Sequence, residues 1–378
     1  MNFSIQQPPR ILFGRGTAAQ AAKEALVFGV RVLFLHGRAM ERSDWLAEAL
    51  TAGGAEVQRY LCFGEPTLAM LEEALRWTKD FDPQVVVALG GGSVLDMGKA
   101  LAALIPAPGG VMDHLEVVGK ALPLAHAPLP FIAIPTTAGT GAEVTKNAVI
   151  GLPDLGRKVS LRDDRMIARV AIVDPALTDA CPRDVTLASG LDAVTQVIEP
   201  YLSCRATLYS DQISAPAILP GMKALVALMQ KENPSARDAL AWTSLCGGLA
   251  LANSGLGAVH GLAGVIGGMT GAAHGAICGA LLGPVLAINR QHSEGIAKAR
   301  AEAVCRILGH CLDCDAEVAP LRLSDWAHGA GLPRLSAMGL EMDQHATVAK
   351  AAQDASSMKG NPVHLSVSDL CEILSSAG

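Results

Sequence analysis

The sequence is poor in aromatic residues and in charge. Only 4% of its 378 residues are aromatic and 17% are charged, whereas 50% are hydrophobic. So apolar a composition excludes an intrinsically disordered chain and predicts a well-buried globular protein. The formal net charge of −6 provides no basic surface of the kind that nucleic acids require. We therefore expect no nucleic-acid partner.

The nine cysteines show neither the pairing of a disulfide framework nor the spacing of a zinc module. Their number is odd, and the one close pair, Cys311 and Cys314, lacks a second CxxC pair; we interpret it as two unpaired thiols in a loop. Unpaired cysteines are typical of a reducing compartment. The first residues, MNFSIQQPPR, contain no apolar stretch after a basic start, so we predict no signal peptide and a cytoplasmic location.

Charged residues are absent from residues 239–289, which also contain twelve glycines. A membrane-spanning helix needs about 20 strongly apolar residues and usually has basic flanking residues. Here the glycines and the polar residues Asn253, His260 and His274 interrupt the apolar pattern, and no basic cluster flanks it. We interpret the segment as buried core helices broken by glycine and expect no membrane contact.

The first half contains a series of short apolar runs that end in Gly, Pro or Thr. Helix-like stretches lie between them at 45–51 and 68–79. The runs are VLFLHG (32–37), VVVALGGG (85–92), FIAIPTT (131–137) and VAIVDP (170–175). Buried continuous strands that alternate with helices are typical of a mostly parallel sheet. Ligands of such sheets bind at the carboxyl ends of the strands.

The second half shows no strand pattern after residue 175. Its pattern is helical over 185–200, 210–229, 236–252, 258–264 and further segments. We therefore predict an α/β domain over 1–178 and an all-α domain over 179–378.

Three consecutive glycines, Gly90, Gly91 and Gly92, follow a predicted strand directly and precede Ser93. We expect a helix from Val94, with Ser93 as its N-cap or as a phosphate ligand. Backbone N–H groups of such a turn, together with the positive end of the helix dipole, bind anions. The spacing fits neither GxGxxG nor a Walker motif, but the strand–glycine–helix context favours a nucleotide phosphate site over a simple tight turn.

A second polar turn, PTTAGTG (135–141), follows another predicted strand. Thr136, Thr137 and Thr140 supply three hydroxyls that either line a cofactor groove or cap their own backbone.

Residues that could bind a metal occur in the helical half. Asp192 and Gln196 are four residues apart, so they share one helix face. His260 and His274 would lie about 21 Å apart on one unbroken helix. The glycines of GGMTG (267–271) should break that helix and let both imidazoles meet. Asp, His and His with an open position would suit zinc or ferrous iron, although core histidines give the same pattern.

Taken in order, the segments resemble the iron-containing alcohol dehydrogenase superfamily over nearly the whole chain. The resembling segments are GGGSVLDMGKA (90–100), PTTAGTGAEVT (135–145), KVSLRDDRMIARVAIVDP (158–175), ASGLDAVTQVIEPY (188–201), AVHGLAG (258–264), AAHGAICGALLGPVLAIN (272–289) and NPVHLSVSDLCEIL (361–374).

The resemblance implies a Rossmann-like N-terminal domain with a mostly parallel sheet, an all-α C-terminal domain, and the architecture of dehydroquinate synthase, with a cleft between the domains. It also implies a homodimer or a larger homo-oligomer. Asp96 and Lys99, in the helix after the glycines, are expected to form a local ion pair. The residues that the resemblance places at NAD(P) are Gly37, Arg38, Gly91, Gly92, Ser93, Asp96, Thr136, Thr137, Thr140 and Lys158.

The resemblance places Asp192, Gln196, His260 and His274 at the family's four metal-ligand positions. The second of these is usually His, and a glutamine oxygen is a weaker ligand than imidazole. The related glycerol dehydrogenases use Asp, His and His alone, which this chain retains. The residues do not distinguish Fe²⁺ from Zn²⁺. A further histidine of the family, four residues after the first of the later pair, is replaced by Gly264, which leaves the proton relay open.

The family's acidic residue for the adenosine ribose is also missing, because the matching stretch reads Leu35-His36-Gly37-Arg38. A 2′-phosphate would meet no carboxylate there, and Arg38 could pair with it, which favours NADP over NAD. Alternatively, Arg38 points into solvent.

The resemblance implies hydride transfer between NAD(P) and a small alcohol, aldehyde or ketone, with Asp192, His260 and His274 acting through the metal. The lack of Arg and Lys between Asp238 and Arg290 favours a neutral substrate. Three alternatives remain: a metal-independent keto-acid reductase similar to maleylacetate reductase, a lyase similar to dehydroquinate synthase, and a catalytically inactive nucleotide-binding protein.

Overall fold

The computed structural model describes residues 2–378 and separates into two compact units. The sheet unit consists of residues 6–137 and 142–178. The helical unit consists of residues 179–378 together with the short segments 2–5 and 138–141.

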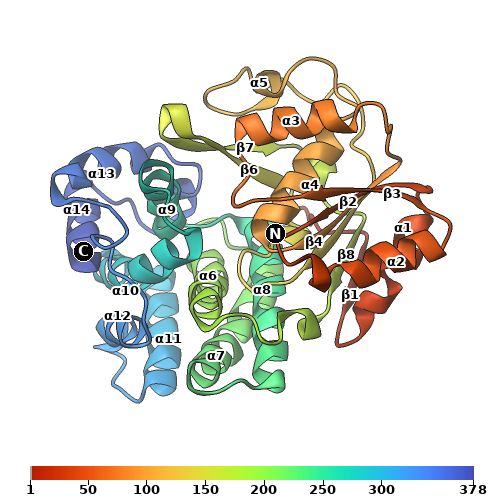
Figure 1. Cartoon of the computed structure of the whole chain (residues 1–378). Helices are drawn as coiled ribbons and strands as arrows, with labels where there is room; N and C mark the ends of the chain where they lie inside the picture. The colour runs from red at the N-terminus through yellow and green to blue at the C-terminus, as the bar shows by residue number, and fades with distance from the viewer. Residues whose placement is uncertain (1) are drawn as a thin grey trace. The chain divides into compact units, whose positions relative to one another are not determined.

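The sheet unit is built on a six-stranded sheet in which every neighbouring pair is parallel (Figure 1). The strand order is β1-β8-β5-β4-β2-β3. The strands are β1 (Arg10–Phe13), β2 (Arg31–His36), β3 (Glu56–Leu61), β4 (Val85–Gly90), β5 (Phe131–Pro135) and β8 (Val170–Val173). The predicted mostly parallel sheet is thus confirmed.

Both faces of the sheet are covered by helices, because successive strand residues point to opposite sides. In β2, Val32 and Phe34 join the apolar core that contains residues of α1 (Ala21–Leu26) and α2 (Asp44–Ala52). Leu33 and Leu35 join the other core, with α3 (Leu68–Thr78) and α4 (Gly92–Leu104). This double burial explains why the central strands read as continuous apolar runs.

Four strands were not predicted from the sequence. β1 and β3 lie at the two edges of the sheet and are partly exposed; β1 has only a short apolar run, and β3 contains three polar residues. The other two, β6 (Asn147–Leu152) and β7 (Arg157–Arg162), pair with each other as an antiparallel hairpin, and β6 packs against α4.

The helical unit contains the second half of the chain, as predicted. Its helix α6 (Arg183–Leu202) packs against α7, α8 and α10. The other helices are α7 (Leu208–Gln230), α8 (Pro234–Ser254), α9 (Ala258–Thr270), α10 (His274–His292), α11 (Gly295–Leu312), α12 (Ala319–Gly329), α13 (His345–Gln353) and α14 (Val367–Ala377).

The segment without charged residues forms α9 and most of α8 and α10, which are separated near Gly255 and Gly271. Both glycines have positive φ, 71° and 70°, which an L side chain rarely adopts. By length and composition, α7 could cross a membrane, and so could α8 and α9 taken together across a 99° bend. Half of the apolar stretch of α7 is buried inside the protein, as in the core helix of a globular domain.

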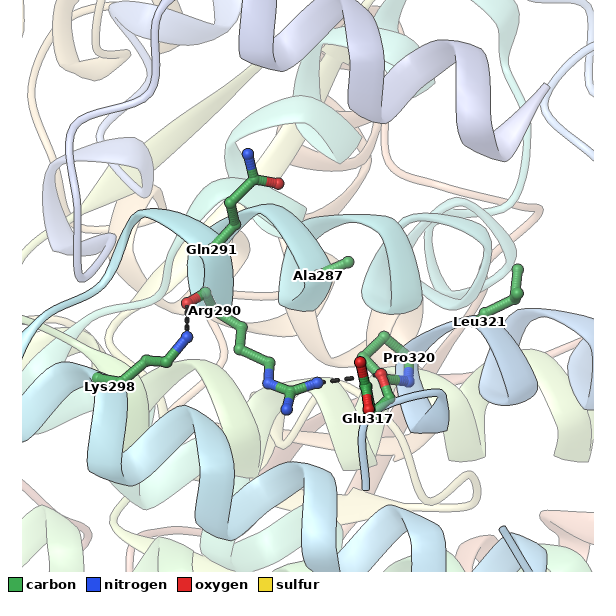
Figure 2. Close-up of a pocket in the computed structure, with 7 residues that line it drawn as sticks. All are labelled: Ala287, Arg290, Gln291, Lys298, Glu317, Pro320 and Leu321. Atoms are coloured by element: carbon green, nitrogen blue, oxygen red, sulfur yellow. Dashed lines mark hydrogen bonds between the residues drawn. The ribbon is translucent and has the colours of Figure 1, made fainter. Parts of the chain in front are cut away.

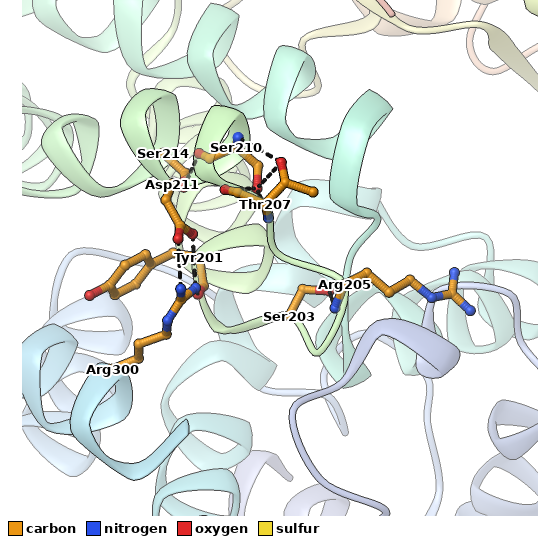
Figure 3. A network of polar contacts seen from close by, with 8 residues as sticks. All are labelled: Tyr201, Ser203, Arg205, Thr207, Ser210, Asp211, Ser214 and Arg300. Atoms are coloured by element: carbon orange, nitrogen blue, oxygen red, sulfur yellow. Dashed lines mark hydrogen bonds and ion pairs between the residues drawn. The ribbon is translucent and has the colours of Figure 1, made fainter. Parts of the chain in front are cut away.

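A polar network fixes the end of α6, the helix that carries Asp192 (Figure 3). Arg300 on α11 donates to both carboxylate oxygens of Asp211, at 2.8 and 2.6 Å, and to the carbonyl oxygen of Tyr201 at 2.6 Å. Thr207 and Ser210 form a capping box at the start of α7. A bidentate Arg–carboxylate contact has a defined geometry. It therefore fixes the positions of α6, α7 and α11 relative to one another.

Candidate functional site

The predicted cofactor residues gather in part at the carboxyl edge of the parallel sheet. From β2 the chain passes to β3 on one side, and then to β4 on the other side of β2. Such a reversal opens a crevice at the carboxyl ends of the two strands. Gly37 and Arg38 follow β2 there, and Gly91 follows β4.

The helix after the glycine turn begins earlier than the sequence predicted. Helix α4 begins at Gly92, two residues before the expected Val94, and its N-cap is Gly91. Ser93 therefore lies in the first helical turn, and the expectation that it is the N-cap was wrong. The physical reason is that Gly91 takes the extended backbone conformation of an N-cap (φ −71°, ψ −178°) without a side chain.

Thr136 and Thr137 lie beside this turn. The backbone N–H of Thr136 donates to the carbonyl oxygen of Gly90 at 3.0 Å, and a Cβ placed on Gly91 would lie 3.4 Å from Oγ1 of Thr137. The two polar turns are therefore neighbours at these residues. Thr140, in contrast, belongs to the segment 138–141 of the helical unit.

The remaining predicted cofactor residues have protein partners within the sheet unit. Lys158 on β7 pairs with Glu65. The guanidinium of the exposed Arg38 lies 5.5 Å from the ring centroid of Phe63. Asp96 lies 3.4 Å from Nζ of Lys99, which confirms the expected ion pair.

Helix α6 carries a stripe of buried polar side chains. Asp192, Gln196 and Glu199 recur at helical spacing and are 1%, 2% and 5% exposed. A buried carboxylate is stable only with a partner of opposite charge or with hydrogen bonds.

His260 and His274 meet as predicted, because the chain breaks between them. Helix α9 ends at Thr270, and Gly271 follows in the left-handed conformation. Gly275 then lets α10 approach α6 closely, since a Cβ there would lie 2.5 Å from the carbonyl oxygen of Ala188. The two imidazole centroids are 5.3 Å apart.

The ligand atoms of four residues lie within 4.8 Å of one another: Asp192, His260, His274 and Cys278. Nε2 of His260 and Oδ1 of Asp192 are 3.2 Å apart but are not aligned for a hydrogen bond, so both buried atoms lack a hydrogen-bond partner. Buried polar atoms without partners are rare and costly. These orphaned atoms fit a bound cation.

Glu199 fixes which nitrogen of His260 faces the cluster. Its Oε2 lies 2.6 Å from Nδ1 of His260, and its Oε1 accepts from the backbone N–H of Val259 at 2.7 Å. Because a carboxylate only accepts, Nδ1 carries the hydrogen and the lone pair of neutral His260 is on Nε2. The same carboxylate–histidine arrangement orients histidine ligands in metal sites.

The electrostatics of this cluster favour positive charge. Burial alone would lower the pKa of His274, but Cys278 and Asp192 outweigh it and raise the pKa to about 9. Burial alone would raise the pKa of Asp192, yet the neighbouring imidazoles hold it below its usual value. The site thus attracts either protons or a metal ion.

The sequence analysis missed Glu199 and Cys278. Glu199 lies seven residues after Asp192, and Cys278 lies four residues after His274. Both spacings place the residue on the same helix face as the predicted ligand, and that signal could have identified them.

Gln196 is buried beside the cluster. Its Nε2 donates to the carbonyl oxygen of Gly139 at 3.0 Å, which orients the amide and leaves Oε1 as its potential ligand atom. A Cβ at Gly264 would meet no atom within 4 Å, so the space directly beside its Cα is open.

A surface pocket at the other end of α10 contributes nothing to this cluster (Figure 2). Its cations already have partners, because Arg290 pairs with Glu302 and Lys298 donates to the carbonyl oxygen of Arg290. Arg290 is sixteen residues from His274 on the same helix, which corresponds to about 24 Å.

None of the nine cysteines, which all lie within residues 2–378, forms a disulfide bond. Cys311 lies in the last turn of α11 rather than in the expected loop, and Cys314 follows the helix. Within residues 2–378, neither belongs to a group of residues that could hold a metal.

Comparison with known proteins identifies the family. Residues 8–175 match the model of iron-containing alcohol dehydrogenases, and residues 186–378 match the C-terminal model of the same family. The NAD-dependent methanol dehydrogenase of Bacillus methanolicus is 31% identical, with 100% of this chain and 99% of the relative covered.

Solved structures agree. An alcohol dehydrogenase from an archaeal halo-thermophile of a Red Sea brine pool has a TM-score of 0.90 at 26% identity and covers 100% of this chain and 99% of its own. The iron-containing alcohol dehydrogenase of Thermococcus thioreducens has a TM-score of 0.86 at 26% identity, with the same coverage. The chain therefore belongs to the iron-containing alcohol dehydrogenase family and is an oxidoreductase of that family.

Proposed function

We propose that the chain transfers a hydride between NAD(P) and a small neutral alcohol or aldehyde, and that Asp192, His260 and His274 hold the divalent metal used in this reaction. The observation that carries the proposal is the pair of buried, unpartnered atoms, Oδ1 of Asp192 and Nε2 of His260, next to a second imidazole. The family match supplies the cofactor class and the class of substrate.

When bound, the metal supplies Lewis-acid stabilisation of negative charge on the substrate oxygen, and the nicotinamide supplies or accepts the hydride. The residues of the chain do the positioning. Glu199 holds the proton on Nδ1 of His260, so that the lone pair of Nε2 remains available to bind a metal. The charge of Asp192 makes the site attractive to cations, and its burial excludes water that would screen this charge.

At the sheet edge, we propose that the backbone of Gly91, Gly92 and Ser93 binds the cofactor phosphates at the start of α4, with Thr136 and Thr137 beside them. NADP is the proposed form of the cofactor, because residues 37–40 after β2 contain no carboxylate and Arg38 is an exposed cation that could pair with a 2′-phosphate. The metal is Fe²⁺ or Zn²⁺.

The experiment is a turnover assay with primary alcohols and aldehydes, with NADH and NADPH in parallel, on protein purified without chelators. We expect turnover that EDTA abolishes and added metal restores, with a higher kcat/KM for NADPH. Asp192→Ala should lose metal and turnover while NADPH still binds, whereas the control Asp325→Ala, at an exposed aspartate of α12, should keep its metal.

Full activity of the metal-free enzyme would contradict the proposed role of the metal and would favour a metal-independent keto-acid reductase. No turnover of metal-loaded enzyme on any alcohol or aldehyde would favour an inactive nucleotide-binding protein. A higher kcat/KM with NADH would overturn the assignment of NADP.

A further inference from the structure

The cluster around Asp192 contains a thiol that the metal assignment above does not use. Cys278 lies one helical turn after His274 on α10, on the same face, and its side chain is fully buried. Its Sγ lies 3.5 Å from Nε2 of His274 and within 4.8 Å of the ligand atoms of Asp192 and His260.

The separations within the cluster fit ligands of a single tetrahedral ion. Bond lengths of about 2.3 Å for Zn–S and about 2.0–2.1 Å for Zn–N place the sulfur and nitrogen of one tetrahedron about 3.5 Å apart. The distance between Sγ of Cys278 and Nε2 of His274 is 3.5 Å. An oxygen and a nitrogen would lie about 3.4 Å apart by the same reasoning, and Oδ1 of Asp192 lies 3.2 Å from Nε2 of His260.

A second observation points to a ligand at this place. Asp192 is 1% exposed, and its Oδ1 has no hydrogen-bond partner although it is enclosed by His260, His274 and Cys278. A cation bound between these side chains would satisfy the carboxylate oxygen and would have the thiol of Cys278 within reach.

We propose that Cys278 is the fourth protein ligand of the metal, as a thiolate, and that the set Asp192, His260, His274 and Cys278 selects zinc over ferrous iron. The inference rests on the proposed function, which supplies the other three ligands. On binding, the S–H bond breaks, the proton leaves to solvent, and a sulfur–metal bond forms. No oxidant or reductant is needed.

A thiolate ligand would compensate for the imidazole that Gln196 replaces. With Gln196 in place of imidazole, three strong ligands remain, and the thiolate restores the number to four. A soft thiolate donor favours zinc over ferrous iron. Zinc can also expand from four to five ligands, so a fourth protein ligand leaves room for a substrate oxygen.

The test uses the full chain, stripped of metal and reloaded with Co²⁺, which replaces zinc and reports its ligands by absorption. We expect a thiolate-to-cobalt charge-transfer band in the near ultraviolet at one equivalent of Co²⁺. Cys278→Ser should lose this band while it retains the visible cobalt bands that the other three ligands produce. Cys246→Ser, a change at another buried cysteine of the helical unit, should keep the band.

Competition between Zn²⁺ and Fe²⁺, followed by metal analysis, gives the second readout. The preference of the unmutated chain for zinc should fall by at least about tenfold in Cys278→Ser, since the softest donor is removed. X-ray absorption of the zinc-loaded unmutated chain should show one sulfur at about 2.3 Å, a measurement that does not depend on the folding of a variant.

Bound cobalt without a charge-transfer band, or bound zinc with nitrogen and oxygen neighbours alone, would overturn the role of Cys278 and leave the three-ligand site intact. Failure of the unmutated chain to bind Co²⁺ or Zn²⁺ at all would overturn this proposal together with the metal of the proposed function.

Discussion

A buried cluster around Lys99 in the sheet unit and a buried cluster around Asp192 in the helical unit differ in how well their polar atoms are satisfied. In the sheet unit, Nζ of Lys99 contacts Oγ1 of Thr145 at 2.9 Å, the carbonyl oxygen of Asn147 at 2.6 Å and Asp96 at 3.4 Å. Two of the three N–H donors of the ammonium group thus have hydrogen-bond acceptors, and Asp96 supplies the opposite charge. In the helical unit, Oδ1 of Asp192 and Nε2 of His260 are buried without a hydrogen-bond partner and lie 3.2 Å from each other.

The two clusters differ in the role that we assign to them. The Lys99 cluster completes itself with protein atoms, so it needs no ligand and holds α4 against the hairpin strand β6. In the Asp192 cluster two buried atoms lack a hydrogen-bond partner, and this incompleteness supports the proposed metal site. The following variants test whether the two clusters have these different roles.

The largest effect is expected from Lys99→Met. Removal of one member of a buried ion pair leaves an uncompensated charge on Asp96 and typically costs about 3–5 kcal/mol of the free energy of unfolding. Denaturant unfolding should show this loss, while the metal content of the folded protein stays the same. Lys120→Met, at an exposed pair with Asp113, is the control and should change stability little. Loss of metal from folded Lys99→Met would mean that the two clusters are not independent.

A pH-dependent effect is expected from Glu143, which is 2% exposed and faces Lys99. Burial raises the pKa of Glu143 from 4.5 to about 7, with Lys99 opposing the shift. The folded state therefore binds this proton more tightly than the unfolded state. Its contribution to stability is complete below pH 4.5 and is lost as the pH rises through 7.

The isosteric change Glu143→Gln should remove this dependence. Between pH 4.5 and 8, the stability of the unmutated protein relative to the variant should decrease by up to about 3 kcal/mol. Denaturant midpoints measured across this range check the prediction. Parallel curves for the two proteins would show that Glu143 does not titrate in this way.

The smallest effect is expected from Glu199→Gln. Glu199 acts through its hydrogen bond to His260. Loss of a hydrogen-bond partner of a metal-binding histidine typically lowers metal affinity by about 10–100-fold. The metal dissociation constant, measured with a competing chelator, should rise by this factor, with the free energy of unfolding of the metal-free protein changing less than in Lys99→Met. An unchanged dissociation constant would exclude a positioning role for Glu199.

The sequence predicted the central elements of the fold because doubly buried strands are recognisable as apolar runs, such as VVVAL in β4. It did not predict β1 and β3, since edge strands are only partly buried and can contain several polar residues, as EVQRYL in β3 does. The helix start at Gly92 was also missed, because glycine forms an N-cap without a characteristic side chain.

For the candidate site, the sequence predicted the meeting of His260 and His274 from the glycines between them. It could not show that Glu199 bonds Nδ1 of His260 or that Cys278 lies beside His274, because both contacts depend on how α6, α9 and α10 pack. Their spacing on the helices indicated a shared face but not the distances between helices.

The most direct test of the central claim is anomalous diffraction, recorded at the metal absorption edge, from crystals of protein purified without chelators. We predict one peak bonded to Oδ1 of Asp192 and to Nε2 of His260 and of His274. A peak at another position, or metal-saturated crystals without a peak between these three side chains, would contradict the account.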